Sequence, residues 1–86
     1  MPTISVFYCI VIQMFWNDHA PPHFHALYGR YEAIVEIETL RVTRGSLPRT
    51  AMALVFGWAE DHRPELMENW KRCRSHQMPI RIAPLT

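Results

Sequence analysis

The stretch HFHALYGRYEAIVEI, residues 23–37, has the pattern of two β-strands joined by a tight turn. Apolar and polar residues alternate after the turn, and Gly29 stands first in the two-residue connection Gly29-Arg30. A type II′ hairpin requires glycine at that position. The sequence therefore predicts paired strands over 23–28 and 31–37, with one face of the second strand in the core and the other facing water.

Two more apolar runs precede this hairpin. Residues 4–7 and 10–16 are rich in Ile, Val, Phe and Trp, and Tyr8-Cys9 is the expected tight connection between them. The loop over 17–22 contains Pro21 and Pro22, which supply no amide to a ladder, so strand pairing must stop there. A short fifth strand is expected near 40–43.

The second half of the chain has helical patterns. Ser46 is a cap candidate, and Pro48 falls in the first turn, where its missing amide costs nothing. A buried stripe follows at Leu47, Ala51, Leu54, Val55, Trp58 and Ala59. Pro64 starts a second helix over 64–76, which carries inward Leu66, Met67, Trp70 and Cys73. Beyond it, Ile80 and Ile82 either add a last short strand or pack on the sheet.

Strands followed by helices predict an α+β fold, a four- to five-stranded, mainly antiparallel sheet followed by two C-terminal helices packed on one face. Eighty-six residues allow a single domain over 1–86, which is strand-rich over 1–44, helical over 46–77 and ends in a tail over 78–86. Hydrophobic residues make up 49% of the chain. We therefore expect apolar surface to be left over for a partner or a second copy.

The two cysteines and the apolar N-terminal segment indicate where in the cell the protein is expected. Cys9 and Cys73 are far apart and form no C-x-x-C pair, so neither a zinc ribbon nor a disulfide framework is indicated. The first sixteen residues lack the basic region of a signal peptide, and their apolar run, interrupted by Gln13, is too short to span a bilayer. We expect a soluble, cytoplasmic protein with two reduced thiols and no membrane association.

Charge is divided between the two halves. Residues 1–40 hold one arginine against four carboxylates, whereas residues 41–86 hold seven arginines and one lysine against four carboxylates. Two kinds of surface, or simply ordinary solvated faces, would explain this distribution. The basic residues of the second half could contact phosphates of RNA or DNA, although no groove-reading or RNA-binding signature accompanies them.

Three of the five histidines, His19, His23 and His25, fall within seven positions. His23 and His25 are two apart on an expected strand, so they leave the same face about 6.6 Å apart along it. With His19 from the preceding loop, the set H-x3-H-x-H supplies the three nitrogens of an open site for a divalent metal such as zinc. In the alternative that needs no ligand, the imidazoles bond to loop backbone and fix the turn.

A third interpretation is acid–base chemistry. Metal-free cleavage of RNA needs a base for the 2′-hydroxyl, an acid for the leaving oxygen and cations for the phosphate. His23 and His25 would be the catalytic pair, and the binding residues around them would be Asp18, Tyr28, Arg30, Arg44 and Arg49. The chain has no nucleophile elbow, P-loop or pair of catalytic carboxylates, so whether it is an enzyme stays open at this point.

Six short stretches together resemble one family. They are PTI (2–4), NDHAPPHFH (17–25), YGRYEA (28–33), GSLPR (45–49), WAEDHRPELMENW (58–70) and IAPL (82–85). The chain resembles the small prokaryotic family numbered 4160 among the domains of unknown function. Cys9 stands where that family more often has Gly, and Gly57 stands where an acidic residue is usual. Mid-helix glycine costs about 1 kcal/mol against alanine, so Gly57 either permits close packing or weakens its helix.

The resemblance implies a gene context and carries over no activity. Genes of this family often lie beside those of another small family, numbered 2442, in an arrangement that resembles a toxin–antitoxin pair. We therefore expect a small intracellular binding protein whose partner is the small protein encoded by the neighbouring gene. The alternatives are a histidine-dependent ribonuclease toxin and a metal-binding protein that uses His19, His23 and His25.

The first or the fifth strand is expected at a sheet edge. Unpaired backbone groups there could accept a strand from the partner. Self-association through the same edge would give a two-fold homodimer.

Overall fold

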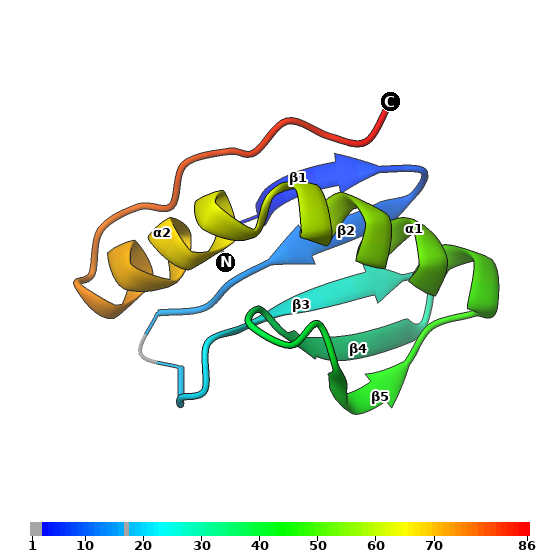
Figure 1. The fold of residues 1–86 in the computed structure, drawn as a ribbon, viewed down its shortest axis with the longest axis horizontal. Coiled ribbons are helices and arrows are strands. Elements are labelled where there is room, and N and C mark those ends of the chain that lie inside the picture. Colours follow the sequence, from blue (N-terminus) through cyan, green and yellow to red (C-terminus); the bar gives the residue numbers. More distant parts are fainter. Residues whose placement is uncertain (1–2, 17) are drawn as a thin grey trace.

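The protein is described by a computed structural model that covers residues 3–16 and 18–86. Five strands form one antiparallel sheet in the order of the sequence (Figure 1), so that β1 and β5 lie at its two edges, as expected. The strands are β1 (Thr3–Phe7), β2 (Ile10–Gln13), β3 (His23–Tyr28), β4 (Tyr31–Glu36) and β5 (Val42–Ser46). Two helices follow, α1 (Arg49–Asp61) and α2 (Arg63–Arg74).

The central hairpin confirms the prediction from its turn. Tyr28 pairs with Tyr31 across the two-residue connection, and Gly29 has a φ of +57°, which glycine adopts without strain. The β1–β2 hairpin turns differently, because Tyr8 and Cys9 both have positive φ, at 49° and 65°. Two left-handed residues in a row are the signature of a type I′ turn.

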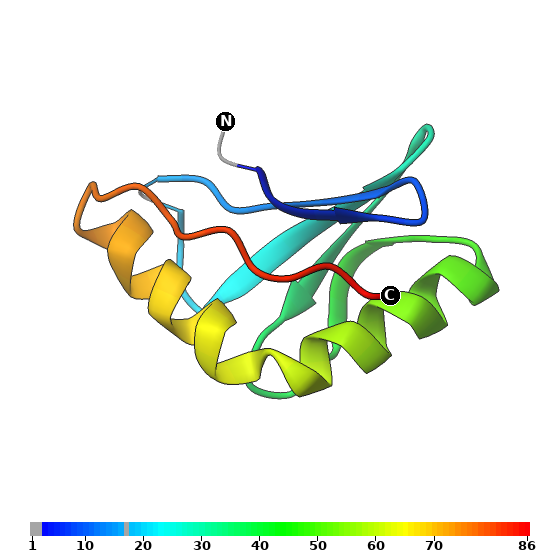
Figure 2. The ribbon, with the colours of Figure 1, turned by 90° about the horizontal axis from the view of Figure 1, so that it is seen from above.

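Both helices cover the same face of the sheet, and the other face is left open (Figure 2). The core between the two layers is apolar, and Trp58 of α1 is fully buried at its centre. Phe7 and Phe24 meet the Trp58 ring at centroid distances of 5.1 and 6.2 Å. Because Trp58 and Trp70 are both buried, they serve the core rather than an exposed stacking surface. The α+β fold with two C-terminal helices on one face is confirmed.

Two strand boundaries differ from the prediction. The second strand, expected over 10–16, ends at Gln13, which pairs with Thr3 on one side and His25 on the other. The alternating pattern continues and Met14 is fully buried, but among the described residues no neighbouring strand continues the ladder. The fifth strand, expected near 40–43, runs over Val42–Ser46.

The fifth strand is irregular. Ile34 pairs with Arg44 and Val35 pairs with Val42, so β5 carries Thr43 as an extra, unpaired residue. Gly45 has a φ of +72°, and a side chain at this position would collide with the backbone oxygen of Glu32. The predicted cap residue Ser46 therefore belongs to the strand, and α1 starts at Arg49 after Pro48, without a side-chain cap.

The second helix spans Arg63–Arg74 rather than 64–76, and its end redirects the chain. The amide of Gln77 donates to the carbonyl of Arg72 (2.8 Å), and the amide of His76 donates to that of Cys73 (3.2 Å). With His76 at a φ of +61°, these bonds form a Schellman motif. The chain then returns along the molecule as residues 78–86, which we call the strap. None of the described helices is long and apolar enough to cross a membrane.

Glycine-to-alanine substitutions should have opposite effects at two positions. Gly57 lies on the exposed side of α1, where an added methyl group meets nothing, so the helix gains propensity without a clash. We expect Gly57→Ala to raise the free energy of unfolding by about 1 kcal/mol. Gly45→Ala should lower it by about 2 kcal/mol or more, because of the collision with Glu32 and the left-handed backbone. Urea unfolding measures both, and equal effects of the two changes would contradict the close approach of Gly45 to the backbone of Glu32.

Candidate functional site

The start of β3 and the loop before it bring three side chains together on the open face of the sheet. His23 and His25 are two residues apart in β3, so they leave the same face, as predicted. Asp18 reaches them from the loop. One donor atom from each of the three side chains lies within 4.8 Å of the other two. We call Asp18, His23 and His25 the triad.

The Asp18 carboxylate is the centre of the triad. Its Oδ2 lies 2.9 Å from Nε2 of His23 and 3.2 Å from Nε2 of His25. Its Oδ1 accepts the backbone amide of His19 at 3.1 Å. Both carboxylate oxygens are thus engaged, and this fixes the orientation of the group between the two rings.

The outer nitrogen of each ring is also held. Nδ1 of His23 donates to the carbonyl oxygen of Pro21 at 2.8 Å. Nδ1 of His25 donates to Oε2 of Glu32 at 3.0 Å. Each of the four ring nitrogens therefore faces an oxygen that accepts, and the arrangement is complete when all four carry a proton or when a cation replaces the two Nε2 protons.

Aromatic side chains pack against both rings. The ring of Phe15 meets His25 edge-on, with a centroid distance of 4.4 Å. The ring of Trp70, from α2, lies 5.1 Å from that of His23. The side chains of His23 and His25 are each 12% exposed, Asp18 is 25% exposed and Glu32 is 52% exposed. The triad is consequently held in place and still reached by water on one side.

Opposing effects act on the pKa of Asp18. Burial of the carboxyl by itself raises its pKa, because it penalises the charged form. Hydrogen bonds from His25 and His23, the charge of His23 and the amide of His19 lower it, and the net pKa lies below the usual value. Asp18 is therefore a carboxylate at neutral pH, which is the form that can bind a cation.

The donor set fits a divalent metal ion. Ligand atoms in a tetrahedral zinc site lie about 2.0–2.1 Å from the metal and thus roughly 3.3 Å from one another. The two distances between histidine nitrogen and carboxylate oxygen, 2.9 and 3.2 Å, are close to that spacing. A histidine that binds a metal usually donates a hydrogen bond from its other ring nitrogen to a carbonyl or a carboxylate. Here those acceptors are the carbonyl of Pro21 and the carboxylate of Glu32.

The predicted third ligand, His19, is not part of this group. Its side chain is exposed, and its contribution is the backbone amide that holds Asp18. Glu32, by contrast, is expected from the sequence only on the solvent-facing side of its strand. The contact between His25 and Glu32 could have been predicted from the hairpin register. His25 pairs with Ile34, so Glu32 is the diagonal neighbour of His25 on the same face, and its long side chain can reach the ring.

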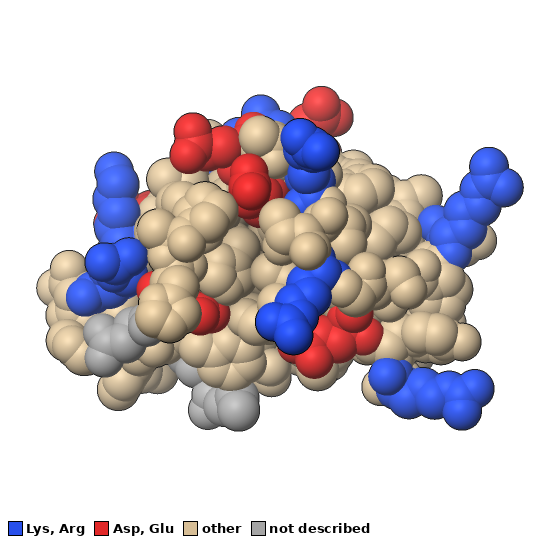
Figure 3. Space-filling model, turned by 90° about the horizontal axis from the view of Figure 1, so that it is seen from below, with Lys and Arg blue, Asp and Glu red and all other residues tan. Residues whose placement is uncertain are grey.

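The other predicted binding residues are spread over the molecule. Arg44 lies on the open face in line with His25, with Ile34 between them. Tyr28 and Arg30 lie at the far end of the β3–β4 hairpin, and Arg49 begins α1 at that same end (Figure 1). Figure 3 shows acidic and basic side chains interspersed on the face seen from below, with cationic side chains at both ends; among the described residues of that face they form no continuous basic surface.

One comparison with known proteins gives a match. The family model described as Domain of unknown function (DUF4160) matches residues 9–71, which include the triad and Glu32 and exclude the strap. No curated protein and no solved structure matches the chain. Because the matched residues make up well over half of the sequence, the chain belongs to the DUF4160 family.

Proposed function

We propose that this protein binds a divalent transition-metal ion such as zinc through Asp18, His23 and His25. The observation that carries the proposal is the convergence of Oδ2 and two Nε2 atoms, with each remaining ring nitrogen already bonded to an oxygen. Free imidazoles on a strand would not need both of their nitrogens fixed. The arrangement therefore supports a site that is organised before the ion arrives.

The number of ligands bears on what the ion does. Structural zinc sites use four protein ligands. Catalytic zinc sites use three protein ligands and leave the fourth position to water or substrate. The triad supplies three, and two histidines with one carboxylate are also the set that holds iron(II) with open positions. We infer that the bound ion keeps at least one position for an external ligand on the open face of the sheet.

The wider role that we propose is that of a small cytoplasmic binding protein in a two-gene, toxin–antitoxin-like module. Family membership supports this part, since the genomic context expected from the resemblance is a neighbouring gene for a small partner protein. The open sheet face and the exposed edge strand β5 are surfaces on which such a partner could dock.

Metal titration tests the site directly. Tag-free protein should bind one Zn²⁺ per chain, measured by calorimetry and by elemental analysis after dialysis. Asp18→Asn should weaken binding by about 100-fold or more, because it removes a charged ligand. Glu32→Gln, which changes only the support of His25, should weaken it by about 10- to 100-fold.

Two matched variants serve as controls for this titration. His19→Ala should leave the affinity unchanged, because the imidazole of His19 is outside the triad and its backbone amide remains. Glu38→Gln removes an exposed acidic group that follows β4 and should also have no effect. Loss of zinc binding in His19→Ala together with full binding in Asp18→Asn would show that the predicted three-histidine site holds the ion instead.

Acid–base cleavage of RNA is the second candidate, favoured by the 5.3 Å between the ring centroids of His23 and His25. In this alternative, RNA incubated with the protein and a chelator is degraded by wild type and stays intact with the His23→Ala, His25→Ala double variant. We expect intact RNA with both proteins, and a stable complex when the chain is co-purified with the product of the neighbouring gene. Cleavage in the presence of chelator that depends on both histidines would replace metal binding with a nuclease function.

A further inference from the structure

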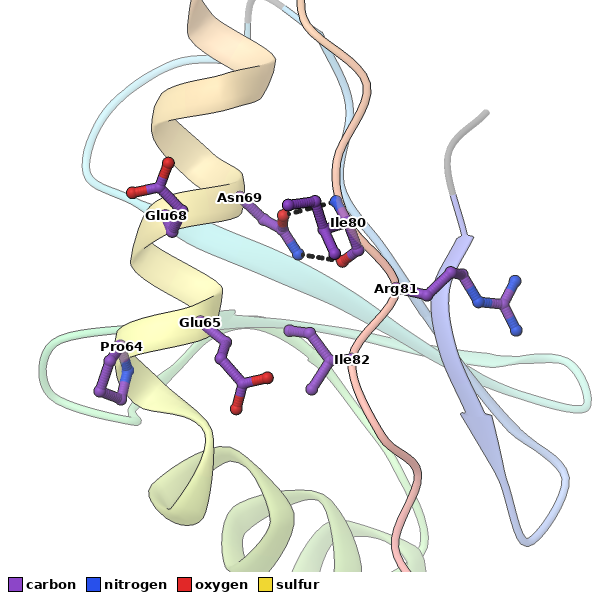
Figure 4. Close-up of a pocket in the computed structure, with 7 residues that line it drawn as sticks. All are labelled: Pro64, Glu65, Glu68, Asn69, Ile80, Arg81 and Ile82. Carbon is purple, nitrogen blue, oxygen red and sulfur yellow. Dashed lines mark hydrogen bonds between the residues drawn. The ribbon is translucent and has the colours of Figure 1, made fainter.

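The strap crosses the molecule between α2 and β1, antiparallel to the helix (Figures 2 and 4). Side chains and backbone groups of the body hold it by hydrogen bonds to its main chain. Nε of Arg72 donates to the carbonyl of Met78 at 2.8 Å, and Nε1 of Trp58 donates to that of Ala83 at 2.9 Å. The amide of Ile82 donates to the carbonyl of Ile4, in β1, at 2.8 Å.

Asn69 makes the most specific of these contacts. Its Nδ2 donates to the carbonyl of Ile80, and its Oδ1 accepts the amide of the same residue, both at 2.8 Å (Figure 4). A strand neighbour in a β-sheet makes the same pair of bonds with its backbone. Asn69 is only 1% exposed with the strap in place, and the strap supplies both hydrogen bonds of its side-chain amide. The side chain of Asn69 therefore binds an extended main chain in the way that a neighbouring strand would.

The side chains of the strap contribute one buried anchor. Ile82 is 4% exposed and joins the core, whereas Met78 and Ile80 are 64% and 57% exposed. A shallow cavity of about 250 Å³ remains beside Ile80 and Ile82, lined from α2 by Pro64, Glu65 and Glu68 (Figure 4). Main-chain bonds with one apolar anchor are the means by which peptide-binding grooves hold extended segments.

We propose that this groove is a peptide-binding site that accepts the strap of a second copy of the chain, so that two copies exchange their straps and form a dimer. The proposal is independent of the metal site. A second copy presents the same main chain with the same anchor at position 82, so the contacts of Ile80, Ile82 and Ala83 described above are reproduced between protomers. Exchange then changes only the hinge that connects α2 to the strap.

The hinge is built in a way that permits such a change. His76 has a φ of +61°, a conformation that costs about 1 kcal/mol or more for a residue other than glycine. The segment over 75–78 is exposed, so its opening breaks the two bonds of the Schellman motif and the Arg72–Met78 bond but no contact of the core. An extended His76 would release that strain and direct the strap away from its own body.

Protein concentration decides whether the monomer or the strap-exchanged dimer predominates. A tethered strap acts at an effective concentration in the millimolar range, so wild type should be a monomer at micromolar concentration and form dimers as it approaches 1 mM. His76→Val disfavours the left-handed hinge and should move dimer formation to lower concentration by about tenfold, whereas His76→Gly should move it higher. Light scattering after size-exclusion chromatography measures the three proteins.

A full-length Ile82→Asp variant tests the groove itself. The charge should keep the strap of this variant out of the core and lower the Tm. A synthetic peptide of residues 77–86 with the natural sequence should then raise the Tm in a concentration-dependent way. The same peptide with aspartate at position 82 should have no effect, and Asn69→Ala in the Ile82→Asp background should abolish the response.

Two outcomes would overturn the proposal. The first is a Tm that does not respond to millimolar natural peptide or, where the variant is unfolded, a helical circular dichroism signal that the peptide does not restore. The second is a groove that binds the peptide while the His76→Val protein stays monomeric at 1 mM. The groove would then hold extended segments of another partner and not those of a second copy.

Discussion

The register of the β3–β4 hairpin is the constraint on which both the core and the triad depend. Gly29 in its left-handed conformation closes the turn so that Tyr28 pairs with Tyr31, and every later pair along the two strands follows. In this register Phe24, Ala26, Ala33 and Val35 enter the core, and the histidines and glutamates face outward. A slip by one residue would exchange the two faces, burying charged groups and exposing the apolar ones. The fold therefore fixes His25 beside Glu32 with the same interaction that builds the core.

The side chains of the triad are largely buried, with 12% to 25% of their surface exposed. The Asp18 carboxylate lies between the two imidazoles and orients both of them. Helix α2 connects this site with the strap groove, because neighbouring residues serve the two sides. Trp70 packs on His23, and Asn69 holds Ile80.

Much of this arrangement could be predicted from the sequence. The hairpin turn gave the bounds of β3 without error, and the apolar stripes identified the core faces of both helices. The end of β2 and the start of β5 could not be predicted, because they depend on where neighbouring strands stop and on the extra residue Thr43 in the β4–β5 ladder. Asp18 and His19 are adjacent, and the sequence alone does not say which side chain turns toward the strand. Asn69 carries a readable signal, since it lies at helical spacing between Leu66 and Cys73.

The protonation of the four ring nitrogens tests the central claim most directly. Long-range ¹H–¹⁵N correlation spectra of uniformly ¹⁵N-labelled protein report which nitrogens of His23 and His25 carry a proton and which bind metal. The account predicts that added Zn²⁺ shifts both Nε2 resonances to the metal-bound range, while both Nδ1 atoms keep the protons that they donate to Pro21 and Glu32. Unchanged Nε2 resonances at saturating Zn²⁺, or a metal-bound shift at His19 in their place, would contradict it.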